Sequence, residues 1–241
     1  MHTGLNIKLK IIVIIMFLSP IFIMKGTGAR KGVIILAYHA VNNNIKGIEE
    51  LFVKPEEFYK QIEYMSKRKY TPLHFNEVSS YWKYKKPVII TFDDGYVDNY
   101  HIAYPILKKF NFKATVFMVA GYVNKPGYLN EAQIKEMKDI ISFQSHTLSH
   151  PELDKLNEEE LENEFVESKA IIEEITGEPV YTIAYPYGCY NQKVADIAAK
   201  HYSYAVNTKK GVYDGLAGNY EINRICICRS NQFGDFMRLI H

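Results

Sequence analysis

The sequence is poor in cysteine, with only Cys189, Cys226 and Cys228 among its 241 residues, and it contains a single tryptophan, Trp82. Cys226 and Cys228 are two residues apart on a predicted strand and therefore share one face. They could hold a metal ion together, but no CxxC motif or second cysteine pair accompanies them. We interpret the cysteines as small buried apolar residues. We expect Trp82, which lies in a helical pattern, to pack in the core.

Acidic residues are missing from the first 31 positions, which contain Lys8, Lys10, Lys25, Arg30 and Lys31. The remaining 210 residues therefore hold 24 basic against 27 acidic residues, so the net charge of +2 hides a mildly acidic body. Such a body gives no reason to expect nucleic-acid binding. The sequence also lacks internal repeats and low-complexity linkers.

The N-terminus has the pattern of a targeting segment. Lys8 and Lys10 precede the apolar run IIVIIMFLSPIFIM at positions 11–24, and small residues ending at Ala29 could form a cleavage site. The run is shorter than the about 17–25 residues that a membrane-spanning helix needs. We predict that residues 1–31 are a signal peptide or N-terminal membrane anchor, with a core helix as the alternative. Residues 32–241 would then form a domain that works outside the cytoplasmic membrane, either secreted or at the cell surface.

The body alternates between strand and helix patterns, and 47% of the chain is hydrophobic, enough for a large core. Helices are predicted to begin near Pro55, Asn130 and Asn157, and Gly177 should end the last of these. The strands are continuous apolar runs, as in parallel sheets covered on both faces. We therefore predict an α/β barrel of seven or eight mainly parallel strands. The predicted strands are Val33–Tyr38, Tyr70–Leu73, Val88–Phe92, Ala114–Val119, Ile140–Ser145, Tyr181–Tyr185, Ser203–Val206 and Glu221–Ile227.

Polar residues and tight turns follow four of these strands. In a β/α barrel, catalytic groups gather at the carboxyl ends of the strands, so these residues should meet at one face. They are His39, Asp93, Asp94, His146, His150, Pro186, Tyr187 and Gly188.

The sequence HTLSH places His146 and His150 four residues apart, so both imidazoles can reach one ion. Alone this spacing is weak, because two solvated loop histidines are more common than a metal site. With a carboxylate from a neighbouring strand end, it becomes a site of two histidines and one carboxylate. Three protein ligands leave a position open for water, which is typical of a catalytic metal.

The adjacent carboxylates Asp93 and Asp94 end a strand that is predicted to be buried, although like charges repel. A bound cation would offset that repulsion. One Asp could then bind the metal while the other takes a proton from water. The alternative is that one of them only caps the turn at Gly95.

From about Val33 to its end, the chain resembles the polysaccharide deacetylases of the NodB-homology type, carbohydrate esterase family four. TFDDG at 91–95 is similar to the first motif of that family, HTLSH at 146–150 to the second, and AYPYG at 184–188 more loosely to the third. The resemblance implies a distorted β/α barrel and metal-dependent removal of N-acetyl groups from aminosugar polymers. The LAYHAV start and AYPYG look most like the branch that acts on poly-N-acetylglucosamine.

The resemblance also implies roles for individual residues. Asp93 would be the general base, the backbone N–H of Tyr187, after Pro186, would help to hold the oxyanion, and His39 would be the general acid. A purely structural hydrogen-bonding role is the alternative for His39. The implied ligands of the divalent metal, usually Zn²⁺ with Co²⁺ or Ni²⁺ as alternatives, are Asp94, His146 and His150.

Two positions depart from the family pattern. Ala184 stands where the third motif commonly has an arginine that orients the base, and the late Leu-x-His motif is matched only by His241, the last residue, which we interpret as accidental. Arg224 lies on the last predicted strand, which a closed barrel brings back towards the early strands. We hypothesise that Arg224 replaces the missing arginine and holds Asp93, with an exposed surface arginine as the alternative.

The expected activity is hydrolysis of amide bonds in an aminosugar polysaccharide, either peptidoglycan or poly-N-acetylglucosamine. The alternatives are an O-deacetylase of a wall polymer and an inactive glycan-binding homologue. We expect Tyr96, Tyr185 and Tyr187 near the mouth of the site to stack on sugar rings. Membrane contact through an uncleaved N-terminus is the other expected interaction.

Overall fold

The structure, a computed structural model, describes residues 32–44, 47–216 and 218–240. The predicted signal peptide or anchor at residues 1–31 lies outside these ranges, as does His241. Within the described ranges, no helix combines the length and the apolar character that crossing a membrane requires.

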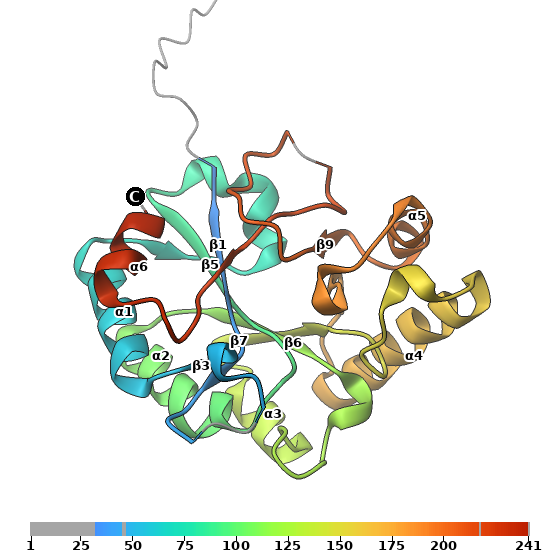
Figure 1. Ribbon diagram of the computed structural model, residues 1–241, viewed down its shortest axis with the longest axis horizontal. Coiled ribbons are helices and arrows are strands. Elements are labelled where there is room, and N and C mark those ends of the chain that lie inside the picture. Colours follow the sequence, from blue (N-terminus) through green and yellow to red (C-terminus); the bar gives the residue numbers. More distant parts are fainter. Residues whose placement is uncertain (1–31, 45–46, 217, 241) are drawn as a thin grey trace, which may run out of the picture.

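A curled parallel sheet forms the centre of the molecule, and helices cover its outer face (Figure 1). Neighbouring strands of this sheet are all parallel; Leu36, for example, lies opposite Ile90 on one side and Ile225 on the other. The strands in order across the sheet are β10 (Ile225–Cys226), β1 (Ile34–Tyr38), β5 (Pro87–Phe92), β6 (Ala114–Met118), β7 (Ile141–Ser145), β8 (Thr182–Ala184) and β9 (Tyr204–Val206), with β4 (Thr71–Pro72) also paired to β5.

The stretch from Ile222 to Cys226 links the two edges of the sheet. Ile222 forms a parallel bridge with Val206 at the end of β9, and β10 pairs with β1. The N–H of Asn207 donates to the carbonyl of Ile222 over 2.9 Å. These contacts bring the end of the chain back to its beginning, and the predicted distorted β/α barrel is confirmed.

The helices begin and end at residues with local reasons to do so. Asn130 and Asn157 each accept a hydrogen bond from the third helical N–H, and the side chain at that position returns one. Gly177 ends α4 with a φ of 66°, which glycine adopts without steric cost. The helices are α1 (Pro55–Lys67), α2 (Tyr104–Phe110), α3 (Glu131–Met137), α4 (Glu158–Thr176), α5 (Gln192–His201) and α6 (Phe233–Leu239), and the shorter helical turns are η1 (Glu49–Leu51), η2 (Phe75–Lys83), η3 (Asn99–Ala103), η4 (Ala120–Tyr122), η5 (Leu153–Lys155) and η6 (Pro186–Gly188).

Every predicted strand overlaps an observed strand, but all the observed strands except β5 (Pro87–Phe92) are shorter than predicted. The largest difference is at Glu221–Ile227, where only Ile225–Cys226 forms a strand. Two further strands, β2 (Ala40–Val41) and β3 (Phe52–Val53), pair with each other and were not predicted, since two residues are too few to show a pattern. Most strand residues are buried, and each large apolar side chain removed from water stabilises the fold by about 1.5–3 kcal/mol.

The expectation that Trp82 packs in the core is wrong. Phe75, Val78 and Tyr81 form the buried face of η2, and Trp82, one residue further on, points outward and is 57% exposed. The cysteines are also less buried than expected. β10 ends at Cys226, so the alternation of faces does not extend to Cys228, and both residues, like Cys189, are half-buried.

Candidate active site

The two residues after β5 send their carboxylates in different directions. Asp93 continues the strand, donates its N–H to the Tyr38 carbonyl over 2.9 Å and is 2% exposed. Asp94 and Gly95 then take left-handed backbone conformations, with φ of 71° and 76°. Aspartate visits this conformation more readily than most residues, and glycine does so freely. The turn therefore leaves Asp93 inside the barrel and directs Asp94 towards the histidines after β7.

Arg224 meets Asp93 inside the barrel. Its Nη1 donates to Oδ1 and its Nη2 to Oδ2, both over 2.7 Å, which is the two-pronged geometry that suits a guanidinium and a carboxylate. Its other bonds go to the Thr91 hydroxyl and the Asn207 carbonyl, each over 3.0 Å, and the side chain is fully buried. The structure thus contains the hypothesised contact between Arg224 and Asp93. The exposed alternative does not apply.

Arg224 determines the protonation of Asp93. Burial alone would raise the pKa of Asp93, but the charge and paired hydrogen bonds of Arg224, assisted by His146 and His39, hold that pKa well below its usual range. Asp93 is therefore ionised near neutral pH. An ionised carboxylate can accept a proton, which the role of a general base requires.

Asp94, His146 and His150 bring three ligand atoms together. The Asp94 Oδ1 lies 3.4 Å from Nε2 of each histidine, and all three atoms lie within 4.8 Å of one another. Ligands at about 2.0–2.1 Å from a tetrahedral ion are about 3.4 Å apart, so this spacing fits a divalent ion. The described residues offer one other cluster with this property, Glu152, Asp154 and Cys189, which is largely exposed.

A second contact prepares His146 to bind a metal. Its Nδ1 lies 2.8 Å from the Ala184 carbonyl, which can only accept, so Nδ1 carries a proton, and in the neutral ring that binds a metal Nε2 presents its lone pair. Burial lowers the pKa of His146, but the hydrogen bond and charge of Asp94 and the charge of Asp93 raise it overall. Burial and the neighbouring His146 lower the pKa of His150 to about 4, so His150 is in the neutral form that binds metals.

The loop that carries the two histidines, residues 146–150, is held by Glu164 of α4. Thr147 and His150 have left-handed φ values of 70° and 66°, which cost about 1–3 kcal/mol each and persist only where the surrounding structure enforces them. The buried Glu164 carboxylate accepts hydrogen bonds from two consecutive N–H groups of the loop, over 2.8 and 2.9 Å, and from the Ser149 hydroxyl over 2.5 Å. These bonds fix the backbone between the two metal ligands.

Glu164, Thr91 and Asn207 were not among the site residues expected from sequence. Glu164 did carry a signal, since it lies on the apolar face of α4 between Leu161 and Ser168, where a carboxylate needs a specific partner. Thr91 and Asn207 carried none, because their importance depends on which distant side chain reaches them.

His39 follows β1, with its Nε2 3.9 Å from Oδ2 of Asp93. Its carbonyl accepts a hydrogen bond from the Asn99 amide over 2.9 Å. Burial lowers the pKa of His39 in spite of the nearby charges of Asp93 and Asp94. His39 is therefore neutral near pH 7 and must gain a proton before it can act as an acid.

The third motif lies beside the metal site. The Tyr187 ring is 62% exposed, and its centroid is 4.6 Å from that of the His150 ring. Tyr187 and Gly188 have left-handed φ values of 58° and 71°, and Pro186 is buried at the start of this turn. The structure brings Tyr187 to the mouth of the site, and the role of its N–H stays a prediction.

The expectation that Tyr185 stacks on sugars at the mouth is wrong. Tyr185 is fully buried, its ring stacks on Tyr190 with centroids 5.0 Å apart, and its hydroxyl donates to the Tyr220 carbonyl. Tyr96 is half-buried and stacked on Tyr128, with centroids 5.4 Å apart. Of the three tyrosines, only Tyr187 presents a largely exposed ring.

The barrel, the three-ligand site and the arginine-held Asp93 define a metal-dependent hydrolase of the β/α class. Residues 82–206 match the model of a protein family described as Polysaccharide deacetylase. The chain belongs to the polysaccharide deacetylase family, carbohydrate esterase family four.

Three similar proteins support this assignment. YxkH of Bacillus subtilis (strain 168), assigned to the polysaccharide deacetylases by name, is 35% identical over 198 residues, which are 79% of this chain and 70% of YxkH. A poly-beta-1,6-N-acetyl-D-glucosamine N-deacetylase of Staphylococcus aureus (strain MRSA252) is 29% identical over 204 residues, 76% of this chain and 70% of the relative. The solved structure of the Streptococcus pyogenes deacetylase PplD in complex with acetate is 31% identical, with a TM-score of 0.82, over 88% of this chain and all of PplD.

Proposed function

We propose that this protein removes N-acetyl groups from N-acetylglucosamine residues of a polysaccharide, and that Asp93, Asp94, His146 and His150 carry the reaction. The observation that supports this most strongly is the pair of adjacent carboxylates with separate partners. Asp94 faces two imidazoles, while Asp93 is held by Arg224 and is not one of the three candidate metal ligands. A metal ligand and a general base side by side are what metal-dependent hydrolysis of an amide uses.

A divalent ion bound by Asp94, His146 and His150 would polarise the acetyl carbonyl and lower the pKa of a water molecule. The donor set of two nitrogens and one oxygen suits Zn²⁺, with Co²⁺ or Ni²⁺ as alternatives.

Asp93 accepts a proton from the attacking water as the new carbon–oxygen bond forms. The backbone N–H of Tyr187 donates to the oxygen of the tetrahedral intermediate. The carbon–nitrogen bond then breaks, and His39 delivers a proton to the leaving sugar nitrogen. Burial lowers the pKa of His39, so His39 does not hold this proton at the start of the reaction. The nearest proton that it can take up is the one that Asp93 removed from water. The products are acetate and a free amine.

The substrate proposal rests on the relative named for poly-beta-1,6-N-acetyl-D-glucosamine, with peptidoglycan as the alternative polymer. The deciding experiment incubates the full-length protein and Zn²⁺ with each polymer, and measures acetate together with new amino groups. We expect equal amounts of both from poly-N-acetylglucosamine. Acetate without new amines would instead identify an O-deacetylase, and no acetate from any polymer would identify an inactive glycan-binding homologue.

We also propose that the enzyme acts outside the cytoplasmic membrane. The basis is the order of basic, apolar and small residues in the first 31 positions. Protease added to intact cells should degrade the protein, whereas recovery only from the cytosol would contradict export.

A further inference from the structure

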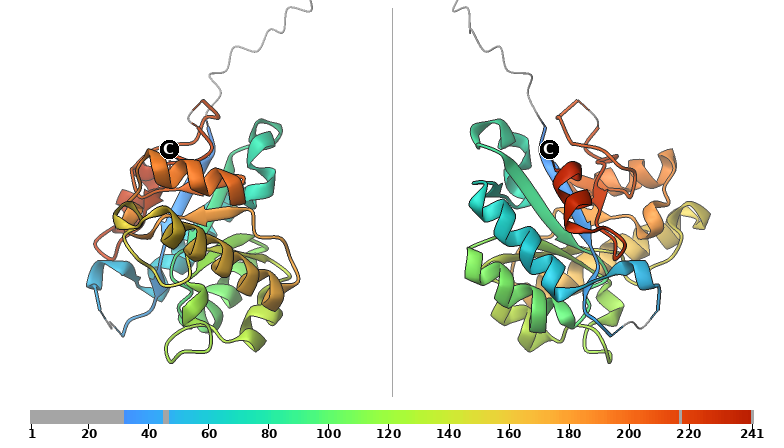
Figure 2. Two further views of the ribbon diagram at one scale, coloured as in Figure 1. Left: turned by 90° about the vertical axis from the view of Figure 1, so that its right-hand side faces the viewer. Right: turned by 60° about the vertical axis from the view of Figure 1, so that its left-hand side comes forward.

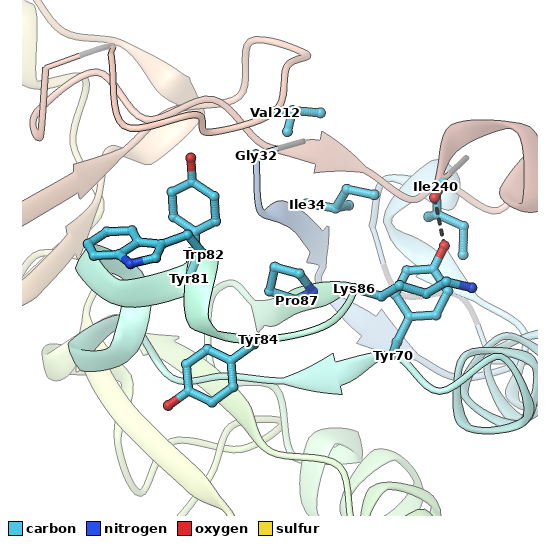
Figure 3. Close-up of a pocket in the computed structure, with 10 residues that line it drawn as sticks. All are labelled: Gly32, Ile34, Tyr70, Tyr81, Trp82, Tyr84, Lys86, Pro87, Val212 and Ile240. Atoms are coloured by element: carbon cyan, nitrogen blue, oxygen red, sulfur yellow. Dashed lines mark hydrogen bonds between the residues drawn. The ribbon is translucent and has the colours of Figure 1, made fainter. Parts of the chain in front are cut away.

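A cavity of about 530 Å³ lies at the opposite end of the sheet from the candidate active site. β1 and β5 begin here, at Ile34 and Pro87, whereas His39 and Asp93 follow the other ends of the same strands. Both views in Figure 2 show η2 beside the start of β1 at this end of the molecule. The lining residues, drawn in Figure 3, are Gly32, Ile34, Tyr70, Tyr81, Trp82, Tyr84, Lys86, Pro87, Val212 and Ile240.

The polar groups of this cavity are already engaged. The Tyr70 hydroxyl donates to the Ile240 carbonyl and the Tyr81 hydroxyl to the Asp214 carbonyl, each over 2.8 Å. The Tyr84 hydroxyl donates to Glu77 over 3.1 Å. A sugar ring needs several free donors and acceptors for its hydroxyl groups, and this cavity offers few. Its chemistry fits an apolar or amphipathic ligand better than a glycan.

Exposed apolar side chains continue outward from the cavity. Trp82 is 57% exposed, Val212 is 47% exposed, and Leu216, on the segment beside Tyr81, is 89% exposed. Large apolar side chains exposed together mark interaction surfaces. Tryptophan in particular favours the boundary between water and the lipid headgroups.

Basic residues without an acidic partner in the described part of the chain surround the same surface, and two of them, Arg68 and Lys86, lie over the rings of Tyr64 and Tyr70. Arg68, Lys69, Lys83, Lys85 and Lys86 are exposed, and none of them forms an ion pair with any residue within the described ranges. The two turns that carry them touch, since Lys86 donates through Nζ to the Arg68 carbonyl over 3.2 Å. Three acids on adjoining segments have partners of their own: Glu63 pairs with Lys67, Glu77 pairs with Lys113, and Asp214 accepts the Leu216 N–H.

We infer that this surface, which we call the basal face and define by Trp82, Val212, Arg68, Lys69, Lys83, Lys85 and Lys86, rests on an anionic phospholipid bilayer. Clustered basic residues around exposed aromatic side chains match the charge and polarity of such a surface. The described chain also begins at Gly32 in the wall of the cavity, and positions 11–24 before it are an apolar run with basic flanks. The inference rests on the proposed export of the protein.

This orientation has a consequence for catalysis. With the basal face on the bilayer, Asp94 and the mouth marked by Tyr187 point away from the membrane, towards polymer outside the cell. The cavity would accept part of a lipid, while the basic residues contact headgroup phosphates.

Trp82 is the only tryptophan of the chain, so its fluorescence reports directly on the basal face. The full-length protein is titrated with vesicles of mixed phosphatidylglycerol and phosphatidylcholine. We expect a blue shift of the emission and quenching by lipids with brominated acyl chains. Lys85→Glu combined with Lys86→Glu should require roughly tenfold or more lipid for the same signal. The matched control, Lys135→Glu with Lys200→Glu on α3 and α5, changes the charge equally and should behave like the wild type.

Two results would overturn the inference. The first is co-sedimentation with vesicles without any change in Trp82 emission, which would mean that only the N-terminal segment attaches the protein. The second is an emission change caused by N-acetylglucosamine oligomers and not by vesicles, which would make the cavity a glycan subsite. Acetate release from soluble oligomers, measured on the same samples, tests the proposed function separately.

Discussion

At the scale of single residues, Asp93 and Asp94 are neighbours in the chain but have different partners. Asp94 faces His146 and His150, while Asp93 is paired with Arg224 and lies close to His39. Their separation depends on the left-handed backbone at Asp94, which turns one carboxylate away from the other. The repulsion expected of adjacent carboxylates is thus offset by a guanidinium for Asp93, and a bound cation would offset it for Asp94.

The first prediction separates the two carboxylates. Asp93→Asn should keep the metal and lose roughly 10²–10⁴-fold in rate, because an amide cannot accept the proton. Asp94→Asn should instead lose metal affinity, because an amide is a weaker ligand. Metal content by elemental analysis, measured beside acetate release, checks both. The opposite pattern would show that the roles are exchanged.

The second prediction concerns Arg224. Arg224→Ala leaves the Asp93 charge buried and unpaired, so the free energy of unfolding should fall by about 3–5 kcal/mol and the rate should fall with the metal retained. Arg224→Lys, the control, keeps the positive charge but cannot form the two parallel hydrogen bonds to Asp93. Compared with Arg224→Ala, it should recover more of the stability than of the rate. Urea unfolding, metal analysis and acetate release measure the three quantities. An unchanged rate in a folded Arg224→Ala variant would show that the ion pair is only structural.

The same pair gives a pH dependence with a definite sign. The pKa of Asp93 in the folded protein lies below its value in the unfolded chain, about 3.9. Its contribution to stability is therefore complete above that unfolded value and is lost as the pH falls towards the folded pKa. Arg224→Ala should remove this component of acid sensitivity.

At the scale of elements, the loop between β7 and α4 owes its shape to contacts with α4. The loop contains two residues with left-handed φ, and one carboxylate of α4 accepts three of its hydrogen bonds. The Asn157 capping box in turn fixes where α4 begins, and so sets the position of Glu164 two turns later. A helix cap thus contributes to the placement of metal ligands that it does not touch.

The third prediction tests this connection. Glu164→Gln preserves size but replaces one acceptor oxygen by a donor, so the loop should loosen and metal affinity should fall roughly 10–100-fold. Excess metal should restore much of the rate, which a misfolded variant could not show. Glu167→Gln, on the exposed side of α4, is the matched control and should bind metal like the wild type. Titration with Zn²⁺ under competition from a chelator gives the affinities.

At the scale of the whole molecule, the two ends of the barrel have opposite characters. The carboxyl ends of the strands carry the ionisable groups of the candidate active site, whereas the other end carries aromatic side chains and basic residues that have no acidic partner among the described residues. This polarity follows from the parallel sheet, in which every loop of one kind emerges at the same end.

The fourth prediction uses the metal as a probe of the folded barrel. A ligand that binds only the folded state stabilises it by about 2.7 kcal/mol at a hundred times its Kd. Removing the metal with a chelator should therefore lower the Tm by about 5–10 °C and abolish activity, and Zn²⁺ or Co²⁺ should restore both. Differential scanning calorimetry with and without chelator measures the shift. In Asp94→Asn the chelator should have little effect on Tm, and equal Tm shifts in both proteins would place the metal elsewhere.

The sequence by itself determined the features that depend on near neighbours. The strand patterns, the caps at Asn130 and Asn157, and the placement of His146, His150 and the Asp pair at strand ends all follow from short-range spacing and could be predicted. The resemblance to a known family added the expected roles of these residues.

Only the tertiary structure decided which distant groups meet. Arg224 reaches Asp93 across 131 positions because the stretch around β10 returns between β9 and β1. Burial likewise depends on the neighbouring elements, which is why Trp82 proved exposed and Tyr185 buried, against expectation. Glu164 became a support of the loop at residues 146–150 only once α4 packed beside it. Local sequence restricts backbone conformation, but the partners of a buried charge are chosen by packing, which no short stretch of sequence contains.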